Sequence, residues 1–175
     1  DQVRENIAIH GNTLHSKVNG KAYVFGTLET PSLGELRNQI LALPTSKGKI
    51  KIREVIGDVQ TLHSDPSNAN ALFQVASQFN LLEMISPEVT PEQGIEHYEY
   101  DLTQGPACAV AAGAGTIYRN YFANVNGQIG QTEQHQIDCL SGIGDILNTN
   151  RKHWKMVNGY ALVTEEGLRA INTKL

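Results

Sequence analysis

The sequence has few cysteines, no long apolar run and little net charge. Its two cysteines, Cys108 and Cys139, are too few for a disulfide framework, and both lie in segments with a helical pattern. Thiols stay reduced inside cells, so we expect a cytoplasmic or nuclear protein. No apolar stretch reaches the length of a membrane span, and the first residues carry no signal-peptide core. From these absences we expect no membrane partner and an intracellular rather than a secreted protein.

The charge balance and the missing motifs exclude several kinds of ligand site. Fourteen Lys and Arg residues against eighteen Asp and Glu residues give a formal charge of -4, which argues against nucleic-acid binding through bulk charge. A small phosphorylated ligand remains possible because it needs only a local site. The six histidines and two cysteines show no metal-ligand spacing, so we expect no zinc site and no cofactor. The glycine patterns of P-loop and dinucleotide-binding proteins are also absent.

Length and patterning favour a single α/β domain. A chain of 175 residues with 40% apolar and 18% charged residues is typical of one globular domain, which we assign to residues 1–175. A capping-box spacing at Ser32 and Glu35 predicts the start of a helix. We expect helices at 33–43, 106–122, 131–147 and after Thr164, one helical turn at 90–93, and strands at 22–28, 49–56, 71–76 and in a hairpin around Asn158-Gly159. Strands that alternate with helices indicate α/β architecture.

The first candidate site segment is Val55-Ile56-Gly57-Asp58-Val59. Asp58 follows a predicted strand, and ligands of open α/β sheets bind at the carboxyl edge of the sheet. Asp58 would there accept a hydrogen bond from an exocyclic amine such as that of adenine. The alternative is a turn aspartate that caps the next segment.

The second candidate segment contains Ser77, Gln78 and Asn80 at the end of the apolar run 71–76. Neutral amides at this place can hold hydroxyl groups or a water molecule without adding charge. Glu83 follows three residues later and would serve as a general acid or base if it were buried. The alternative is a strand end whose amides cap a turn.

The third candidate segment is Gln104-Gly105-Pro106-Ala107-Cys108, which leads into a helix of small residues. Free N–H groups at such a helix start attract anions, and small side chains let a ligand approach closely. A helix packed tightly in the core is the alternative, because two internal glycines must be compensated by close packing or by a ligand.

Cys108 also suggests a different chemistry. A cysteine near a helix start can have a lowered pKa and act as a nucleophile. His135 or His153 would then be the base, and Gln104 would help to form an oxyanion hole. The alternative is a small apolar thiol packed in the core.

The order of the three segments resembles that of macro domains, which bind ADP-ribose in a three-layer α/β/α fold. The texts VASQFNLLEM and TQGPACAVAAGAGTIYRNYF carry this resemblance, which spans residues 50–122. It implies that Asp58 contacts adenine and that Gln78 or Asn80, next to Ser77, faces the distal ribose. It also implies that Gln104, Gly105, Pro106, Ala107 and Cys108 approach the pyrophosphate.

This chain departs from the macro-domain pattern at three points. Ala-Ser-Gln-Phe-Asn stands in place of the Asn-Ala-Ala-Asn signature, and the triple-glycine loop is missing. No second phosphate loop occurs before Leu175, so we expect that the mixed sheet is incomplete and that more chain or a further domain follows. The sequence is therefore similar to a divergent member of the family.

The resemblance implies that the chain binds ADP-ribose or an ADP-ribosylated macromolecule. As an ADP-ribosyl glycohydrolase, it would use Glu83 or the ligand's own phosphate to activate water, while Asn80 and Gln78 orient the distal ribose. Two alternatives remain open. One is a binding module without catalysis, and the other is a papain-like thiol hydrolase that uses Cys108.

Overall fold

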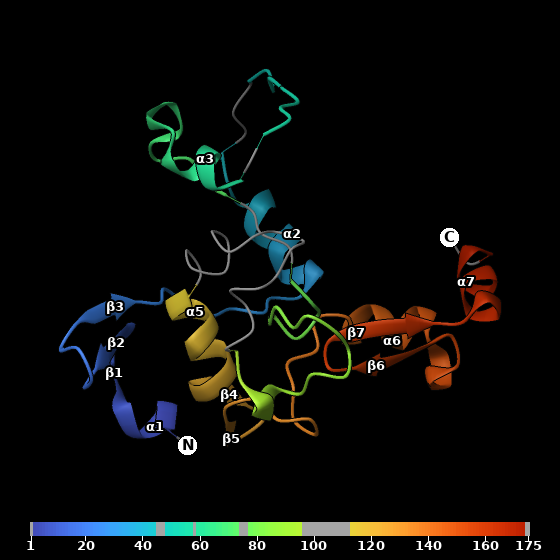
Figure 1. Ribbon diagram of the computed structural model, residues 1–175. Coiled ribbons are helices and arrows are strands. Elements are labelled where there is room, and N and C mark those ends of the chain that lie inside the picture. Colours follow the sequence, from blue (N-terminus) through green and yellow to red (C-terminus); the bar gives the residue numbers. More distant parts are fainter. Residues whose placement is uncertain (1, 45–47, 58, 74–76, 96–112, 174–175) are drawn as a thin grey trace.

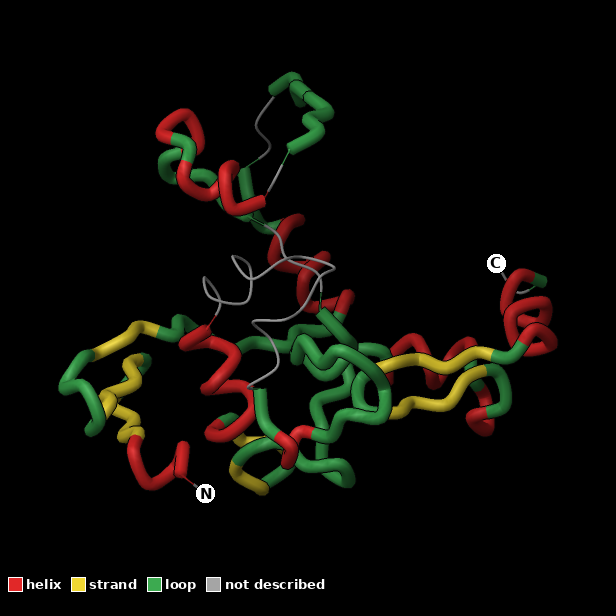
Figure 2. Tube along the Cα trace, in the orientation of Figure 1, coloured by secondary structure: helices red, strands yellow, loops and turns green. Residues whose placement is uncertain are grey.

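The computed structural model describes residues 2–44, 48–57, 59–73, 77–95 and 113–173. Its described residues form short helices and three small antiparallel sheets (Figures 1 and 2). The chain thus combines helices and strands, as the alternating patterns predict. Figure 1 shows a central helix, α5, between the first sheet and the last hairpin, whereas α2 and α3 extend away from both.

The N-terminal part is a short helix followed in the chain by an antiparallel sheet of three strands. Helix α1 (Gln2–Asn6) leads into β1 (Ile7–His10), which pairs with β2 (Thr13–Ser16), and β2 pairs with β3 (Ala22–Val24). The predicted strand at 22–28 is thus confirmed for its first three residues.

Helix α2 (Leu33–Leu41) begins at the predicted capping box. The Glu35 amide donates to Ser32 Oγ at 3.2 Å, and the Ser32 amide donates to Glu35 Oε2 at 2.7 Å. These two bonds satisfy amides that the first helical turn leaves unpaired. The bond from the Ser32 amide, with a second one from the Ser32 hydroxyl to Glu35 Oε2 at 2.8 Å, holds the pKa of the Glu35 carboxyl below its ordinary value. The helix ends at its cap Ala42, two residues before Pro44.

The predicted strand at 49–56 is wrong. Residues 48–57 form neither a strand nor a helix, and Ile52 and Ile56 are 91% and 100% exposed. An alternating pattern forms a strand only where a partner accepts its hydrogen bonds, and no described strand pairs with this segment. The next elements are α3 (Val59–Ser64) and η1 (Pro66–Asn68). Residues 71–73 of the predicted strand 71–76 are not in a strand, and 74–76 lie outside the described residues.

The central part consists of a loop, a helix and a two-stranded ribbon. Residues 77–95 include the short helix η2 (Pro91–Gln93) at the predicted Thr90 cap. Helix α5 (Gly113–Ile117) continues into the wider turn η4 (Tyr118–Phe122), which confirms the C-terminal part of the predicted helix 106–122. Strands β4 (Asn124–Val125) and β5 (Gln128–Ile129) follow as an antiparallel pair.

The C-terminal part is a helix, a hairpin and a final helix. Its elements are α6 (Ser141–Leu147), η5 (Thr149–Arg151), β6 (Trp154–Val157), β7 (Tyr160–Val163) and α7 (Glu165–Asn172). The hairpin around Asn158-Gly159 and the Thr164 cap of α7 are confirmed.

Only the last seven residues of the predicted helix 131–147 are helical. In the preceding loop, the Ile137 amide donates to Gln131 Oε1 at 3.0 Å, and the Leu140 amide donates to Asp138 Oδ1 at 2.8 Å. Polar side chains that bind nearby amides compete with the helical bonds of the backbone. This competition explains the loop.

The interior is small and rich in side-chain amides. Leu82 and Met84 form an apolar cluster, against which Val89, Ile95 and Tyr160 pack. The buried polar side chains of the described residues are Asn80, Thr116, Asn120, Gln131, Asn148 and Asn158. No described helix is both long and apolar enough to cross a membrane.

Candidate functional site

The loop 77–84, which carries the predicted catalytic residues, is closed by the side chain of Gln78. Gln78 Oε1 accepts from the Met84 amide at 2.8 Å, and Gln78 Nε2 donates to Met84 O at 3.2 Å. Gln78 Nε2 also lies 3.2 Å from the hydroxyl of Tyr160, which itself donates to Met84 O at 2.5 Å. The Gln78 carboxamide therefore joins the two ends of the loop and fixes them to β7.

Asn80 holds the same loop from inside. Its side chain is 0% exposed, its Oδ1 accepts from the Leu82 amide at 3.0 Å, and its Nδ2 donates to Gln136 Oε1 at 2.9 Å. Gln136 Nε2 donates in turn to Asn158 Oδ1 at 3.0 Å. Each amide in this chain fixes the orientation of the next, because an oxygen must face a nitrogen at every step.

Two side chains join this loop to the turn η4. Arg119 Nε donates to Leu81 O at 2.7 Å, and Gln131 Nε2 donates both to Asn80 O at 3.0 Å and to Arg119 O at 3.2 Å. The loop that holds the second candidate segment therefore contacts η4, which lies downstream of the third candidate segment in the chain. Sequence reasoning assigned no role to Arg119, although it lies in a text that carries the resemblance, and Gln131 lies in no recognisable motif.

The structure describes four of the residues predicted to form the site. Gln78 and Asn80 lie together but bind backbone and amide groups of the protein itself. Ser77 is exposed and its Oγ donates to Gln78 O at 3.1 Å, and Glu83 is half-buried. The other predicted site residues lie outside the described residues: Asp58, Gln104, Gly105, Pro106, Ala107 and Cys108.

The engaged amides limit the chemistry that this loop can perform as it stands. The carboxamide groups of Gln78 and Asn80 already have partners for both their oxygen and their nitrogen. Asn80 is also fully buried, so a ribose hydroxyl reaches its amide only if the loop opens. The catalytic roles of Gln78, Asn80 and Glu83 therefore stay predictions.

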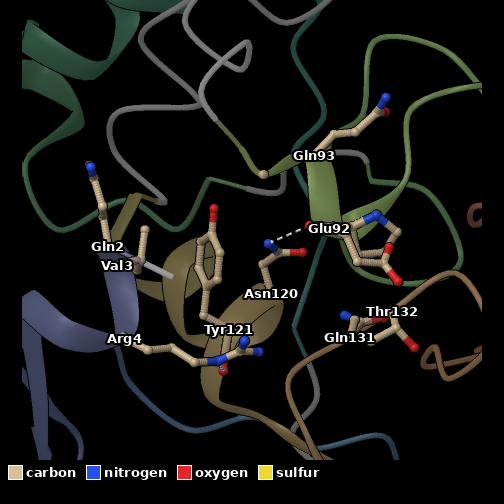
Figure 3. Close-up of a pocket in the computed structure, with 11 residues that line it drawn as sticks. Gln2, Val3, Arg4, Glu92, Gln93, Asn120, Tyr121, Gln131 and Thr132 are labelled. Atoms are coloured by element: carbon tan, nitrogen blue, oxygen red, sulfur yellow. Dashed lines mark hydrogen bonds between the residues drawn. The ribbon is translucent and has the colours of Figure 1, made fainter.

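A cavity of about 490 Å³ lies beside η4, at a place that sequence reasoning did not identify (Figure 3). Its walls come from α1, η2, η4 and the start of the loop after β5. The residues that shape its polarity are Arg4, Glu92, Asn120 and Tyr121. Arg4 and Asn120 are 116 positions apart, so no local pattern could have joined them.

Asn120 carries an acceptor without a partner. The side chain is 1% exposed, and its Nδ2 donates to Pro91 O at 3.1 Å. The Oδ1 atom is buried and accepts no hydrogen bond in the structure. Turning the amide over would set this oxygen against Pro91 O, so the bond of Nδ2 fixes the assignment. A buried acceptor without a donor costs about 1–3 kcal/mol.

Opposite charges line the two sides of this cavity. Arg4 Nε donates to Tyr121 O at 3.1 Å, and the guanidinium lies 6.0 Å from the centre of the Tyr121 ring. The two carboxylate oxygens of Glu92 accept from the Glu133 amide at 2.9 and 3.0 Å. Figure 3 shows Arg4 and Glu92 on opposite sides of Asn120. The cavity therefore has a positive wall and a negative wall.

No family model matches this chain, and neither a curated protein nor a solved structure matches it.

Among the described residues, no group of three or more His, Cys, Asp and Glu side chains could hold a metal ion. Cys139 is the described free cysteine. Although Cys139 is exposed, desolvation by the surrounding protein and the neighbouring charge of Asp138 raise the pKa of its thiol. A raised pKa lowers the thiolate fraction at neutral pH, so Cys139 is a poor nucleophile.

Proposed function

We propose that this chain is a macro-like α/β domain that binds ADP-ribose or a related nucleotide diphosphate. The observation that supports the proposal is the packing of the loop 77–84 against η4 through Arg119 and Gln131. The loop 77–84 contains the second segment of the resemblance, and η4 ends the text that begins with the third. In a macro domain these two segments face one ligand. In this proposal Asp58 holds the adenine, and Gln104 to Cys108 hold the diphosphate.

The proposed fold is the three-layer α/β/α arrangement of the macro domains. The described helices and strands agree with it only in being mixed, because their three sheets are small and antiparallel. The partner in this proposal is free ADP-ribose or an ADP-ribosylated macromolecule.

A binding module without catalysis is the second candidate function. The internal hydrogen bonds of Gln78 and Asn80 favour it, because these amides are the groups that the hydrolytic version assigns to the distal ribose. In the hydrolytic version Glu83 activates a water molecule, and the N–H groups at the start of the helix stabilise the leaving diphosphate.

A ligand titration tests binding. The 175-residue chain is titrated calorimetrically with ADP-ribose, AMP and NAD, and its thermal unfolding is followed with each ligand. A ligand at about 100 times its Kd should add about 2.7 kcal/mol to the free energy of unfolding. Asp58→Ala should weaken binding of ADP-ribose, while Asp145→Ala in the exposed part of α6 should not. Absence of binding by all three ligands would overturn the proposal.

An assay for release of ADP-ribose from a modified protein separates the two candidates. If the chain is a hydrolase, Glu83→Gln should abolish release and leave the Kd for ADP-ribose unchanged. Binding without any release identifies the non-catalytic module. Full release by the Glu83→Gln variant would remove Glu83 from the mechanism.

A further inference from the structure

The cavity beside η4 contains a feature that the proposed nucleotide site does not use. Asn120 Oδ1 has no donor, and the Nδ2 of the same amide is fixed on Pro91 O at 3.1 Å. Buried side-chain acceptors in native proteins are nearly always paired with a donor. Asn120 lines the cavity but its Oδ1 is buried, so an N–H group that enters the cavity supplies the missing donor only when the side chain shifts.

The Glu92 carboxylate is a second group of the cavity that can accept hydrogen bonds from a ligand. Glu92 carries a carboxylate whose two oxygens bind one backbone N–H, so lone pairs remain on both oxygens. In Figure 3 the Asn120 oxygen points toward the side of the cavity on which Glu92 lies. An acceptor and a carboxylate on one side favour a ligand group with several donors and a positive charge, such as an ammonium group.

The wall of the cavity that contains Arg4 favours a negatively charged ligand group. Arg4 lies on that side, and its guanidinium is held over Tyr121 by the bonds of Nε to Tyr121 O and of Nη2 to Ile129 O, at 3.1 and 3.4 Å. A guanidinium that is held in one orientation binds carboxylates well. The cavity volume of about 490 Å³ lies in the range of small-molecule sites, about 300–1,000 Å³.

We propose that this cavity binds a small zwitterion, with its ammonium group at Asn120 Oδ1 and Glu92 and its carboxylate at Arg4. Free amino acids and dipeptides share this chemistry. None of the described residues assigned to ADP-ribose lines the cavity, and the two proposals are tested with different ligands. The two proposals can therefore fail independently.

Calorimetric titration of the whole chain with free amino acids and with dipeptides tests the proposal. We expect at least one of these two classes of compound to bind. The class that binds shows whether the ligand has the length of one residue or of two. The N-acetyl and methyl-ester forms of the same compound each lack one charge and should bind at least about 10-fold more weakly. No binding at about 10 mM, which corresponds to less than about 3 kcal/mol, or equal binding of the blocked forms, overturns the proposal.

Variants of the charged residues provide the matched controls. Glu92→Gln keeps an oxygen for the Glu133 amide but removes the negative charge, and Arg4→Gln removes the positive charge. Each should weaken binding of the zwitterion at least about 10-fold, and Arg4→Lys should recover part of the loss. Asp145→Asn makes the same chemical change in the exposed part of α6, outside the cavity, and should leave the Kd unchanged. Unchanged binding by the Glu92→Gln and Arg4→Gln variants would exclude the site, and ADP-ribose titration should not respond to either.

Discussion

Two Asn-Gly turns of this chain differ in what surrounds the glycine. Gly127 and Gly159 have φ angles of +91° and +80°, and each follows an asparagine that also has a positive φ. Both glycines therefore sit in the left-handed region, where a side chain is strained. A Cβ at Gly127 would meet no atom within 4 Å, whereas a Cβ at Gly159 would clash with the buried carboxamide of Asn80. Replacement by alanine at the two positions thus separates backbone strain from the clash.

The structure gives the size of the difference. Left-handed backbone costs an alanine about 1–2 kcal/mol, which both variants share. In Gly159→Ala the new Cβ would lie 2.7 Å from Asn80 Nδ2, so Asn80 must move. Movement breaks its bonds to the Leu82 amide and to Gln136, and each unpaired group costs about 1–3 kcal/mol. We expect a loss of about 1–2 kcal/mol for Gly127→Ala and about 3–8 kcal/mol for Gly159→Ala.

Urea unfolding of the two variants measures this difference. Gly159→Ala should lower the midpoint much more than Gly127→Ala, with the same m value. In an Asn80→Ala background the extra cost of Gly159→Ala should disappear, because the clashing side chain is gone. Equal midpoints for the two single variants, or an extra cost that survives in the Asn80→Ala background, would refute the role given to Asn80.

Two further predictions concern the α2 cap and the free thiol. Ser32→Ala should cost about 1 kcal/mol of helix stability and lower the far-UV circular dichroism signal. The bonds from Ser32 lower the pKa of Glu35, so stability is present above the unfolded pKa and is lost as the pH falls through the folded value; an NMR titration that finds an ordinary pKa contradicts this. Cys139 should react slowly with iodoacetamide in a Cys108→Ser background, with a midpoint above the ordinary thiol pKa. Asp138→Asn should lower that midpoint, and an unchanged midpoint would remove Asp138 as a cause.

Features determined by neighbouring residues could be predicted from the sequence. The capping box of α2 needs only Ser32 and Glu35, and the last hairpin needs only the turn residues Asn158 and Gly159 between two apolar segments. The Thr164 cap of α7 is equally local. In each case the hydrogen bonds that form the element join residues close in the chain, so their spacing is enough.

Features that need a distant partner could not be predicted. The segment 49–56 has the alternation of a strand, but pairing depends on another strand with unpaired backbone groups, and the sequence does not show whether one is adjacent. The helix predicted over 131–147 loses its first part to the side chains of Gln131 and Asp138. The pattern of apolar residues carries no information on this competition.

The roles of the candidate site residues also depend on distant partners that the sequence does not reveal. Sequence reasoning selected Gln78 and Asn80 as unusual polar residues after an apolar run, and both do have a specific role in the loop. A neutral amide can bind a ligand or its own backbone equally well, and its position in the chain does not decide between them. The cavity beside η4 depends on contacts of Arg4 with Tyr121 and Ile129, and no sequence motif predicts these contacts.

The amide network decides how the loop 77–84 could take part in a reaction. Its bonds are directional, so they fix one conformation of the loop, and a ligand that binds through the fully buried Asn80 must first open the loop and break some of them. The amides of Leu82 and Met84 report this event, because each donates to one of these side chains. Saturating ADP-ribose should leave their hydrogen exchange unchanged or slower if the loop is only a rigid wall. Faster exchange of both amides on binding would instead mean that the network opens toward the ribose, as the hydrolytic version requires.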